Sequence, residues 1–194
     1  MIALVVYESM FGNTAALAGA VAEGLARGQS GGVDGRAADG SGGDHPEVEV
    51  REVGEAPAAL PDDLDLLVVG APTHAFSLSR KETRAEAHRQ GATRGRDATG
   101  VREWLTDVQV DRSPVFATFD SRVAKVRHLP GCASRKAARL GQQRGLTAPM
   151  ARESFYVADM SGPLVEGELG RAREWGRRLA ERLTASRGRS AAGR

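Results

Sequence analysis

The sequence predicts an α/β domain in which a parallel sheet is covered by helices on both faces. Apolar runs of strand length occur at 2–7, 64–71 and 114–119. They contain too few polar residues for strands with one face in solvent, so we expect central, parallel strands. Between them the apolar residues recur with a helical period. Strands and helices that alternate along one chain favour a doubly wound sheet with right-handed crossovers.

Two weaker segments complete a five-stranded sheet. Residues 47–53 alternate charged and apolar side chains, which is typical of an edge strand with one face in water. Residues 154–158 form a shorter apolar segment that we place near the opposite edge.

Helical periodicity is clearest over 14–27 and 169–183, and shorter helices are predicted over 101–108 and 134–144. Trp104 and Trp175 fall within these helices. We expect both rings to pack in the core against the sheet rather than to stack on a ligand.

Three segments lie outside this scheme. Residues 28–45 have almost no apolar content, and we expect a flexible surface loop there; residues 184–194 are expected to form a disordered basic tail. The polar, Arg-rich stretch 81–99 is longer than a minimal connection, and it fits a lid, a partner surface or a solvated loop. Residues 1–183, including the segments 28–45 and 81–99, are interpreted as a single domain.

The composition is that of an ordinary globular protein. The chain has 194 residues, of which 41% are hydrophobic and 27% charged. It has no apolar stretch near the roughly 20 residues that cross a membrane. Cys132 is its only cysteine, which rules out an intrachain disulfide and suggests a cytoplasmic location. The four histidines are not clustered with cysteine, so no metal site is expected.

The net charge is only +2, but arginine is concentrated over 80–96 and 171–194. Neither segment interleaves aromatic residues with its positive charge, so we expect no nucleic-acid binding. Exposed positive charge would instead attract an acidic partner protein.

A hydroxyl-bearing loop joins the first strand to the first helix, and it contains Ser9, Met10, Phe11, Gly12, Asn13 and Thr14. The start of a helix presents unpaired backbone N–H groups and the positive end of the peptide dipole, which suits a phosphate. The loop lacks the lysine of a Walker motif and the three glycines of a dinucleotide fingerprint. Its polar residues could also serve only to cap the helix.

Ligands of doubly wound sheets bind at the carboxyl ends of the strands. The loop after the third strand supplies Pro72, Thr73, His74, Ala75 and Phe76, and the end of the fourth supplies Thr118, Phe119 and Asp120. An aromatic residue in each segment could enclose a flat ring whose phosphate lies on the first loop. Phe119 could alternatively point into the core.

The spacing of Ser9, Gly12 and Thr14 resembles the phosphate-binding loop of flavodoxins, and the Gly-Ala-Pro-Thr run that ends at Thr73 is similar to their ring-binding loop. The resemblance covers roughly residues 1–183. It implies the strand order 2-1-3-4-5 and FMN as the cofactor. The chain departs from the usual acidic surroundings of the ring, because Arg80, Lys81 and Arg122 follow the same two strands.

The function that this resemblance implies is electron transfer through bound FMN, in which no residue has a catalytic role. The alternative is an NAD(P)H-dependent FMN quinone or nitro-compound reductase, with His74 as a proton donor. The partner would be a redox protein or a small quinone-like acceptor, and the chain a monomer or weak dimer. A third interpretation keeps the fold without the flavin. We favour the carrier.

Overall fold

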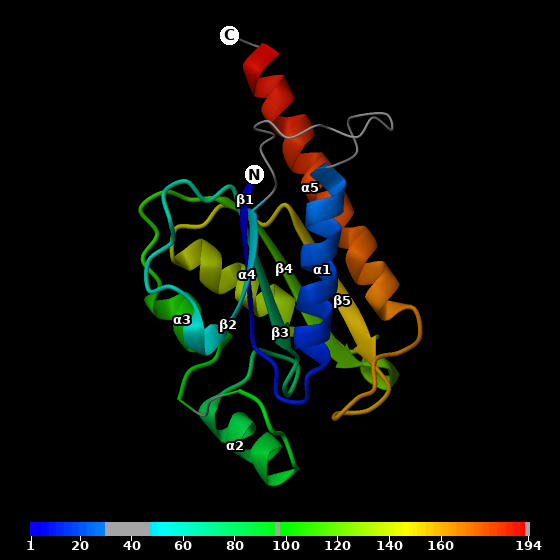
Figure 1. Ribbon diagram of the computed structural model, residues 1–194. Coiled ribbons are helices and arrows are strands. Elements are labelled where there is room, and N and C mark those ends of the chain that lie inside the picture. Colours follow the sequence, from blue (N-terminus) through cyan, green and yellow to red (C-terminus); the bar gives the residue numbers. More distant parts are fainter. Residues whose placement is uncertain (30–46, 96–97, 193–194) are drawn as a thin grey trace.

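The structure is a computed structural model that describes residues 1–29, 47–95 and 98–192. The described chain forms one parallel sheet in the order β2-β1-β3-β4-β5, as the resemblance implied (Figure 1). Its strands are β1 (Ile2–Tyr7), β2 (Glu47–Glu52), β3 (Leu66–Pro72), β4 (Val115–Val123) and β5 (Ala151–Val157). Its α-helices are α1 (Asn13–Gln29), α2 (Lys81–Arg89), α3 (Val101–Asp107), α4 (Ala133–Gln143) and α5 (Glu168–Ala192). Short 3₁₀ turns follow β2 at Val53–Glu55 and β4 at Ala124–Val126.

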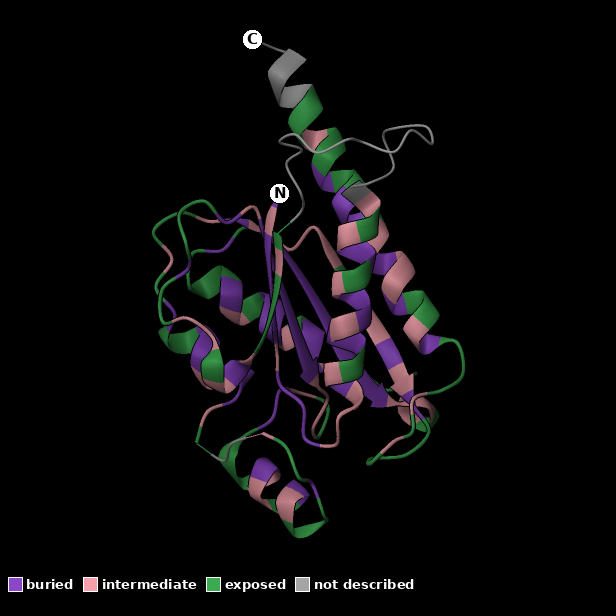
Figure 2. Ribbon diagram, viewed as in Figure 1, coloured by how far each residue is buried: buried purple, intermediate pink, exposed green. Residues whose placement is uncertain are grey.

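Helices cover both faces of the sheet, and the pattern of β1 explains why (Figure 2). Ala3 and Val5 pack in a cluster with α1 and α5, whereas Leu4 and Val6 pack on the other face with α3 and α4. Successive side chains of a strand point to opposite faces, so an uninterrupted apolar run requires a layer of helices on each side.

An aromatic cluster fills the core under α5. The rings of Phe119, Phe155 and Trp175 meet edge to face, with centroids 5.9–6.2 Å apart. Trp104 is also buried, and its indole N–H donates to the Pro57 carbonyl. Both tryptophans therefore pack in the core, as predicted.

Two boundaries of the helices differ from the sequence prediction. Helix α1 extends through Gln29, so residues 28 and 29 are helical rather than part of a loop; residues 30–45 of the predicted loop lie outside the described residues. Helix α5 continues to Ala192 where a tail was predicted. Arg187 pairs with Asp65 near the start of β3, and this contact supports the additional turns.

The strand β4 continues four residues beyond the predicted end at 119, and the segment 81–89 is a helix. In Figure 1, α2 lies beyond the carboxyl ends of the strands, apart from the helices that cover the sheet. No helix of the described residues has the length and hydropathy needed to cross a membrane.

Helices α1 and α5 approach closely because a glycine on each helix faces the backbone of the other. A Cβ atom on Gly176 would lie 2.2 Å from the Val21 carbonyl oxygen, and one on Gly24 would lie 2.0 Å from that of Arg173. Both contacts are with backbone, which cannot move aside without separating the helices.

We therefore expect Gly176→Ala to lower the free energy of unfolding by about 1–3 kcal/mol, the usual cost of overpacking. The matched control is Gly170→Ala on the same helix, where the added methyl group meets no atom within 4 Å. The control should be neutral or stabilise by up to about 1 kcal/mol, since alanine favours helix. Urea denaturation measures the free energy of unfolding of each variant, and equal values for the two variants would contradict the packing argument.

Candidate functional site

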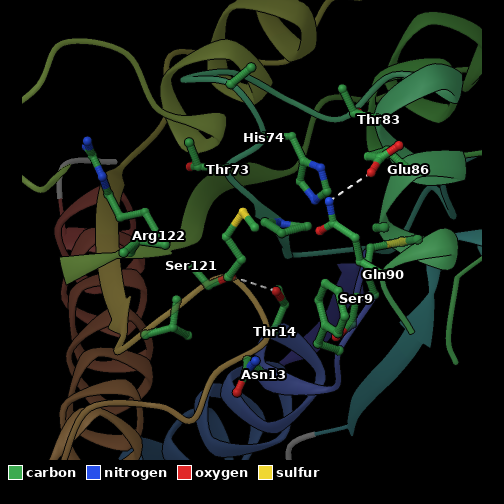
Figure 3. Close-up of a pocket in the computed structure, with 18 residues that line it drawn as sticks. Ser9, Asn13, Thr14, Thr73, His74, Thr83, Glu86, Gln90, Ser121 and Arg122 are labelled. Carbon is green, nitrogen blue, oxygen red and sulfur yellow. Dashed lines mark hydrogen bonds between the residues drawn. The ribbon is translucent and has the colours of Figure 1, made fainter. Parts of the chain in front are cut away.

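A cavity of about 250 Å³ opens at the carboxyl edge of the sheet (Figure 3). Three loops and α2 form its wall. From the first loop and from the loop after β3 come Ser9, Met10, Phe11, Asn13, Thr14, Pro72, Thr73, His74 and Ala75. The remaining wall consists of Thr83, Glu86, Ala87, Gln90, Ser121, Arg122, Val123, Val157 and Met160.

The loop between β1 and α1 has the geometry of an anion site. Gly12 has a φ of 87°, in the left-handed region that favours glycine, and its N–H donates to Ser9 Oγ at 3.1 Å. The first amides of a helix lack acceptors within it. In the described structure, nothing accepts from the N–H groups of Asn13, Thr14 or Ala15.

Two side chains of this loop connect it to distant segments. Thr14 Oγ1 and Ser121 Oγ lie 2.8 Å apart and share one hydrogen bond across the cavity floor. The Asn13 amide donates to the Ser161 carbonyl at 3.0 Å. The first loop is thus held against the ends of both β4 and β5.

The loop after β3 is a tight turn. The backbones of His74 and Ser77 exchange two hydrogen bonds of 2.9 Å, and Ala75 and Phe76 between them have φ values of 45° and 62°. His74 lines the cavity, and burial lowers the pKa of its imidazole, with a further lowering by the charge of Arg84. Phe76 does not line the cavity; its side chain is exposed beside the mouth.

The residues expected on the opposite side of the ring lie elsewhere. Thr118, Phe119 and Asp120 are fully buried within β4 and do not line the cavity. Phe119 belongs to the aromatic cluster of the core, so it cannot cover a ligand ring. Because β4 is longer than predicted, the cavity wall begins after Asp120.

Hydrogen bonds to the buried Asp120 explain why β4 is longer than the sequence predicted. Its carboxylate accepts hydrogen bonds from Ser134 Oγ at 2.5 Å, Ser154 Oγ at 2.9 Å and Thr73 Oγ1 at 2.9 Å. Thr73 Oγ1 in turn accepts from the N–H of Ala133, the first residue of α4, at 3.0 Å. A polar residue that reads as loop in the sequence can therefore continue a buried strand, since its charge is fully hydrogen-bonded.

Arg122 is buried beside the cavity. Its Nη2 donates to the carbonyls of Val126 at 2.7 Å and Leu129 at 3.1 Å, which orders the loop after β4. Its Nε is also buried but has no hydrogen-bond partner among the described residues. A cation with a spare donor thus lies at the wall that the sequence had assigned to Phe119.

Helix α2 is the part of the site that sequence reasoning missed. It contributes Thr83, Glu86 and Ala87 to the wall, and its C-cap residue Gln90 also lines the cavity, where Figure 3 shows His74 and Gln90 directed toward each other. Ala87 and Ala92 pack on Met10 of the first loop. The only sequence signal was the unusual length of 81–99, because a helix whose buried face is made of alanine and arginine shows no apolar stripe.

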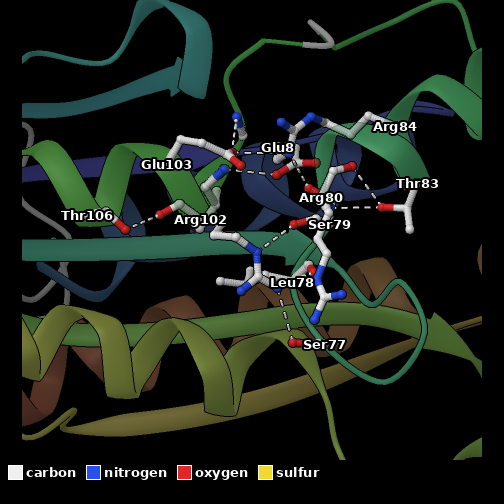
Figure 4. A network of polar contacts seen from close by, with 12 residues as sticks. Glu8, Ser77, Leu78, Ser79, Arg80, Thr83, Arg84, Arg102, Glu103 and Thr106 are labelled. Atoms are coloured by element: carbon white, nitrogen blue, oxygen red, sulfur yellow. Dashed lines mark hydrogen bonds and ion pairs between the residues drawn. The ribbon is translucent and has the colours of Figure 1, made fainter.

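A buried arginine anchors α2 to the domain (Figure 4). Arg84 is fully buried; its Nη1 lies 3.1 Å from Glu103 Oε2 and donates to Ser79 Oγ at 2.9 Å. Glu8, the residue before the first loop, accepts from the N–H of Val101 at 2.9 Å. Burial raises the pKa of Glu8, and hydrogen bonds from Ser79 and Val101 together with the charge of Arg84 oppose that rise.

Solved structures resemble the chain in fold. A flavodoxin from the domain Archaea superposes with a TM-score of 0.56 at 17% identity, over 95% of this chain and 99% of that one. The flavodoxin of Streptococcus pneumonia TIGR4 superposes with a TM-score of 0.56 at 17% identity, over 94% of this chain and 99% of that one. The chain has the flavodoxin fold. A flavone reductase also shares this fold, with a TM-score of 0.53 at 15% identity, over 95% of this chain and 63% of its own.

No protein-family model matches the sequence, and no curated protein matches it either. No group of three or more metal-ligating side chains occurs among residues 1–29, 47–95 and 98–192.

We expect Arg84→Met to lower the free energy of unfolding by about 3 kcal/mol, because it leaves the buried Glu8 carboxyl without the neighbouring charge of Arg84. Arg89→Met is the matched control on the same helix, since Arg89 is exposed and pairs only with the exposed Glu86. That control should stay within about 0.5 kcal/mol of the parent. Urea denaturation at neutral pH compares them, and a tolerated Arg84→Met would show that Arg84 is not the anchor of α2.

Proposed function

We propose that the chain binds FMN in this cavity and transfers electrons through the bound flavin. The observation that carries the proposal is the continuity of the cavity, which runs from an amide-rich loop at the start of α1 to the turn after β3 and the end of β4. Such a shape suits a ligand with a phosphate at one end and a flat ring at the other.

The residues present fit this ligand. The free amides of Asn13, Thr14 and Ala15 match phosphate oxygens, and the buried Arg122 Nε is a donor without an acceptor. Pockets for cofactors commonly enclose about 300–1,000 Å³. The cavity lies just below that range and is open to solvent, so part of the ligand would remain exposed, as electron exchange with a partner requires.

The hydroxyl groups of Thr14 and Ser121 on the cavity floor would help to bind the phosphate. When Thr14 and Ser121 share one hydrogen bond, one of the two O–H groups is the donor and the other keeps its proton for a ligand oxygen. Hydrogen bonds to an ionised phosphate are stronger than those between neutral groups. The loop would thus hold the phosphate without a lysine.

One part of the cavity wall, at the ends of β4 and β5 and in the loop after β5, is apolar. Val123, Val157 and Met160 line it, and they would exclude water from one side of the ligand. FMN, when bound, supplies the electron transfer, while the protein supplies orientation and electrostatics. The nearby charge of Arg122 favours negative charge on the ligand by Coulomb attraction.

The part of the cavity wall formed by α2, with Thr83, Glu86 and Ala87, supports a second candidate function. This function is an NAD(P)H-dependent reductase of quinones or nitro compounds. Burial lowers the pKa of His74 and so favours its neutral imidazole, which has one N–H that can donate to a substrate oxygen. Gln90 and Thr83 place further polar groups in the same part of the cavity. These groups suit a small substrate more than a protein partner.

The first test is the visible absorption spectrum of freshly purified protein, followed by titration of the stripped chain with FMN and detection by flavin fluorescence quenching. Gly12→Val should weaken FMN binding by roughly tenfold or more, because a β-branched residue at φ 87° costs about 1–3 kcal/mol and distorts the amides. Gly19→Ala on α1, with no atom within 4 Å of the new methyl group, should bind as the parent does. Absence of FMN uptake by the parent would refute the proposal.

The second test separates the two candidate functions. As a carrier, the FMN-loaded chain should oxidise NADPH with a quinone only when a separate reductase is added. As a reductase it should do so alone, and His74→Asn should then slow turnover more than it weakens FMN binding. Stopped-flow absorbance at the NADPH band measures both cases.

A further inference from the structure

Positive charge is segregated on one part of the carboxyl edge. Residues 121–136, from the end of β4 to the first turn of α4, contain five Arg and Lys and no Asp or Glu, although the whole chain has a net charge of only +2. The run 66–81, which ends with Arg80 and Lys81, also lacks carboxylates. Arg80, Lys81, Lys125 and Arg127 are exposed, and they belong to the segments that follow β3 and β4 beside the cavity.

Two large apolar side chains are exposed in the same place. Phe76 and Leu129 are each 47% exposed. Their loops are in contact, because a Cβ atom on Gly131 would lie 2.6 Å from the carbonyl oxygen of Phe76. We call the surface made of Phe76, Arg80, Lys81, Lys125, Arg127 and Leu129 the basic rim; it adjoins the cavity mouth, since Ala75 lines the cavity.

The basic rim is held rigidly from beneath. Arg102 donates to the carbonyls of Leu78 at 2.6 Å and Ser79 at 2.9 Å, which ties down the loop after β3 (Figure 4). Arg122 does the same for the loop after β4 through the carbonyls of Val126 and Leu129. Phe76 adopts a φ of 62°, uncommon for a bulky residue, so the surroundings keep this aromatic side chain outside the core.

An exposed, preorganised aromatic residue loses little conformational entropy when it is covered. Exposed cations around it would attract a negatively charged molecule and orient it toward the mouth. Single-stranded nucleic acid would need several aromatic platforms for successive bases, whereas the basic rim has one. These features favour an acidic protein as the occupant.

We propose that the basic rim docks an acidic protein that carries a redox centre near its surface. This inference rests on the proposed function, because the rim adjoins the mouth through which a bound flavin would exchange electrons. The acidic partner would be steered by Arg80, Lys81, Lys125 and Arg127, and its apolar centre would cover Phe76 and Leu129.

The probe is an acidic [2Fe–2S] ferredoxin with a fluorescent label, titrated with the full chain and followed by anisotropy. The titration is done with the flavin-stripped and the FMN-loaded protein, at about 20 and about 200 mM salt, because screening distinguishes exposed charges. We expect binding in both forms and an affinity at least roughly tenfold weaker at the higher salt. Cytochrome c, a basic redox protein, should not bind.

Matched variants locate the surface. The double change Lys125→Glu and Arg127→Glu should weaken ferredoxin binding by roughly tenfold at low salt. Arg178→Glu with Arg182→Glu, exposed positions further along α5, alters the net charge equally and should change the affinity by less than about twofold. Phe76→Ser should weaken binding by the same factor at both salt concentrations, since it removes apolar contact and no charge.

Equal losses in the two double variants, or no binding of ferredoxin by the folded parent, would overturn the proposal. An oligothymidylate that displaces ferredoxin and binds more tightly would assign the rim to nucleic acid instead. If the stripped chain binds ferredoxin but takes up no FMN, the proposed function fails and the docking surface stands. If it takes up FMN but does not bind ferredoxin, the docking surface alone fails.

Discussion

The buried carboxylate of Asp120 is the interaction on which the carboxyl edge of this sheet depends. A charge with no access to water is tolerated only when hydrogen bonds replace its hydration, and here three hydroxyl groups do so, from Thr73, Ser134 and Ser154. These residues belong to the loop after β3, to α4 and to β5. One side chain therefore links β4 to the loop after β3, to α4 and to β5.

The second constraint is the attachment of α2. Within the flavodoxin fold of this chain, the residues between β3 and α3 include a helix that lies beyond the strand ends and forms one wall of the cavity. The buried Arg84 holds it through Ser79 and Glu103, and Met10 holds it through Ala87 and Ala92. The loop between β1 and α1 is thus coupled to α2, because Met10 belongs to that loop and packs on Ala87 of α2.

The two sides of the cavity mouth suit different kinds of partner. The wall formed by α2, where His74 and Gln90 lie beside the carboxylate of Glu86, offers hydrogen-bonding groups of the scale of a small molecule. The basic rim offers charge and an aromatic anchor of the scale of a protein. In the electron-carrier function the basic rim would bind the partner protein, whereas in the reductase function the wall formed by α2 would bind the small substrate. The same bound flavin would serve either function.

The sequence alone determined the layered sheet and the hydroxyl loop, because these follow from local patterns, whereas the strand order was implied by the resemblance to flavodoxins. The apolar alternation of β1 requires helices on both faces, and the polar residues from Ser9 to Thr14 need only the start of α1 beside them. The sequence did not reveal where β4 ends, nor that residues 81–89 form the helix α2. Asp120, Arg122 and Arg84 read as loop or surface residues, since a charged residue is buried only when partners far along the chain hydrogen-bond to it. Those partners come together only in the tertiary structure, which placed Phe119 in the core and left the cavity wall to Ser121, Arg122 and α2.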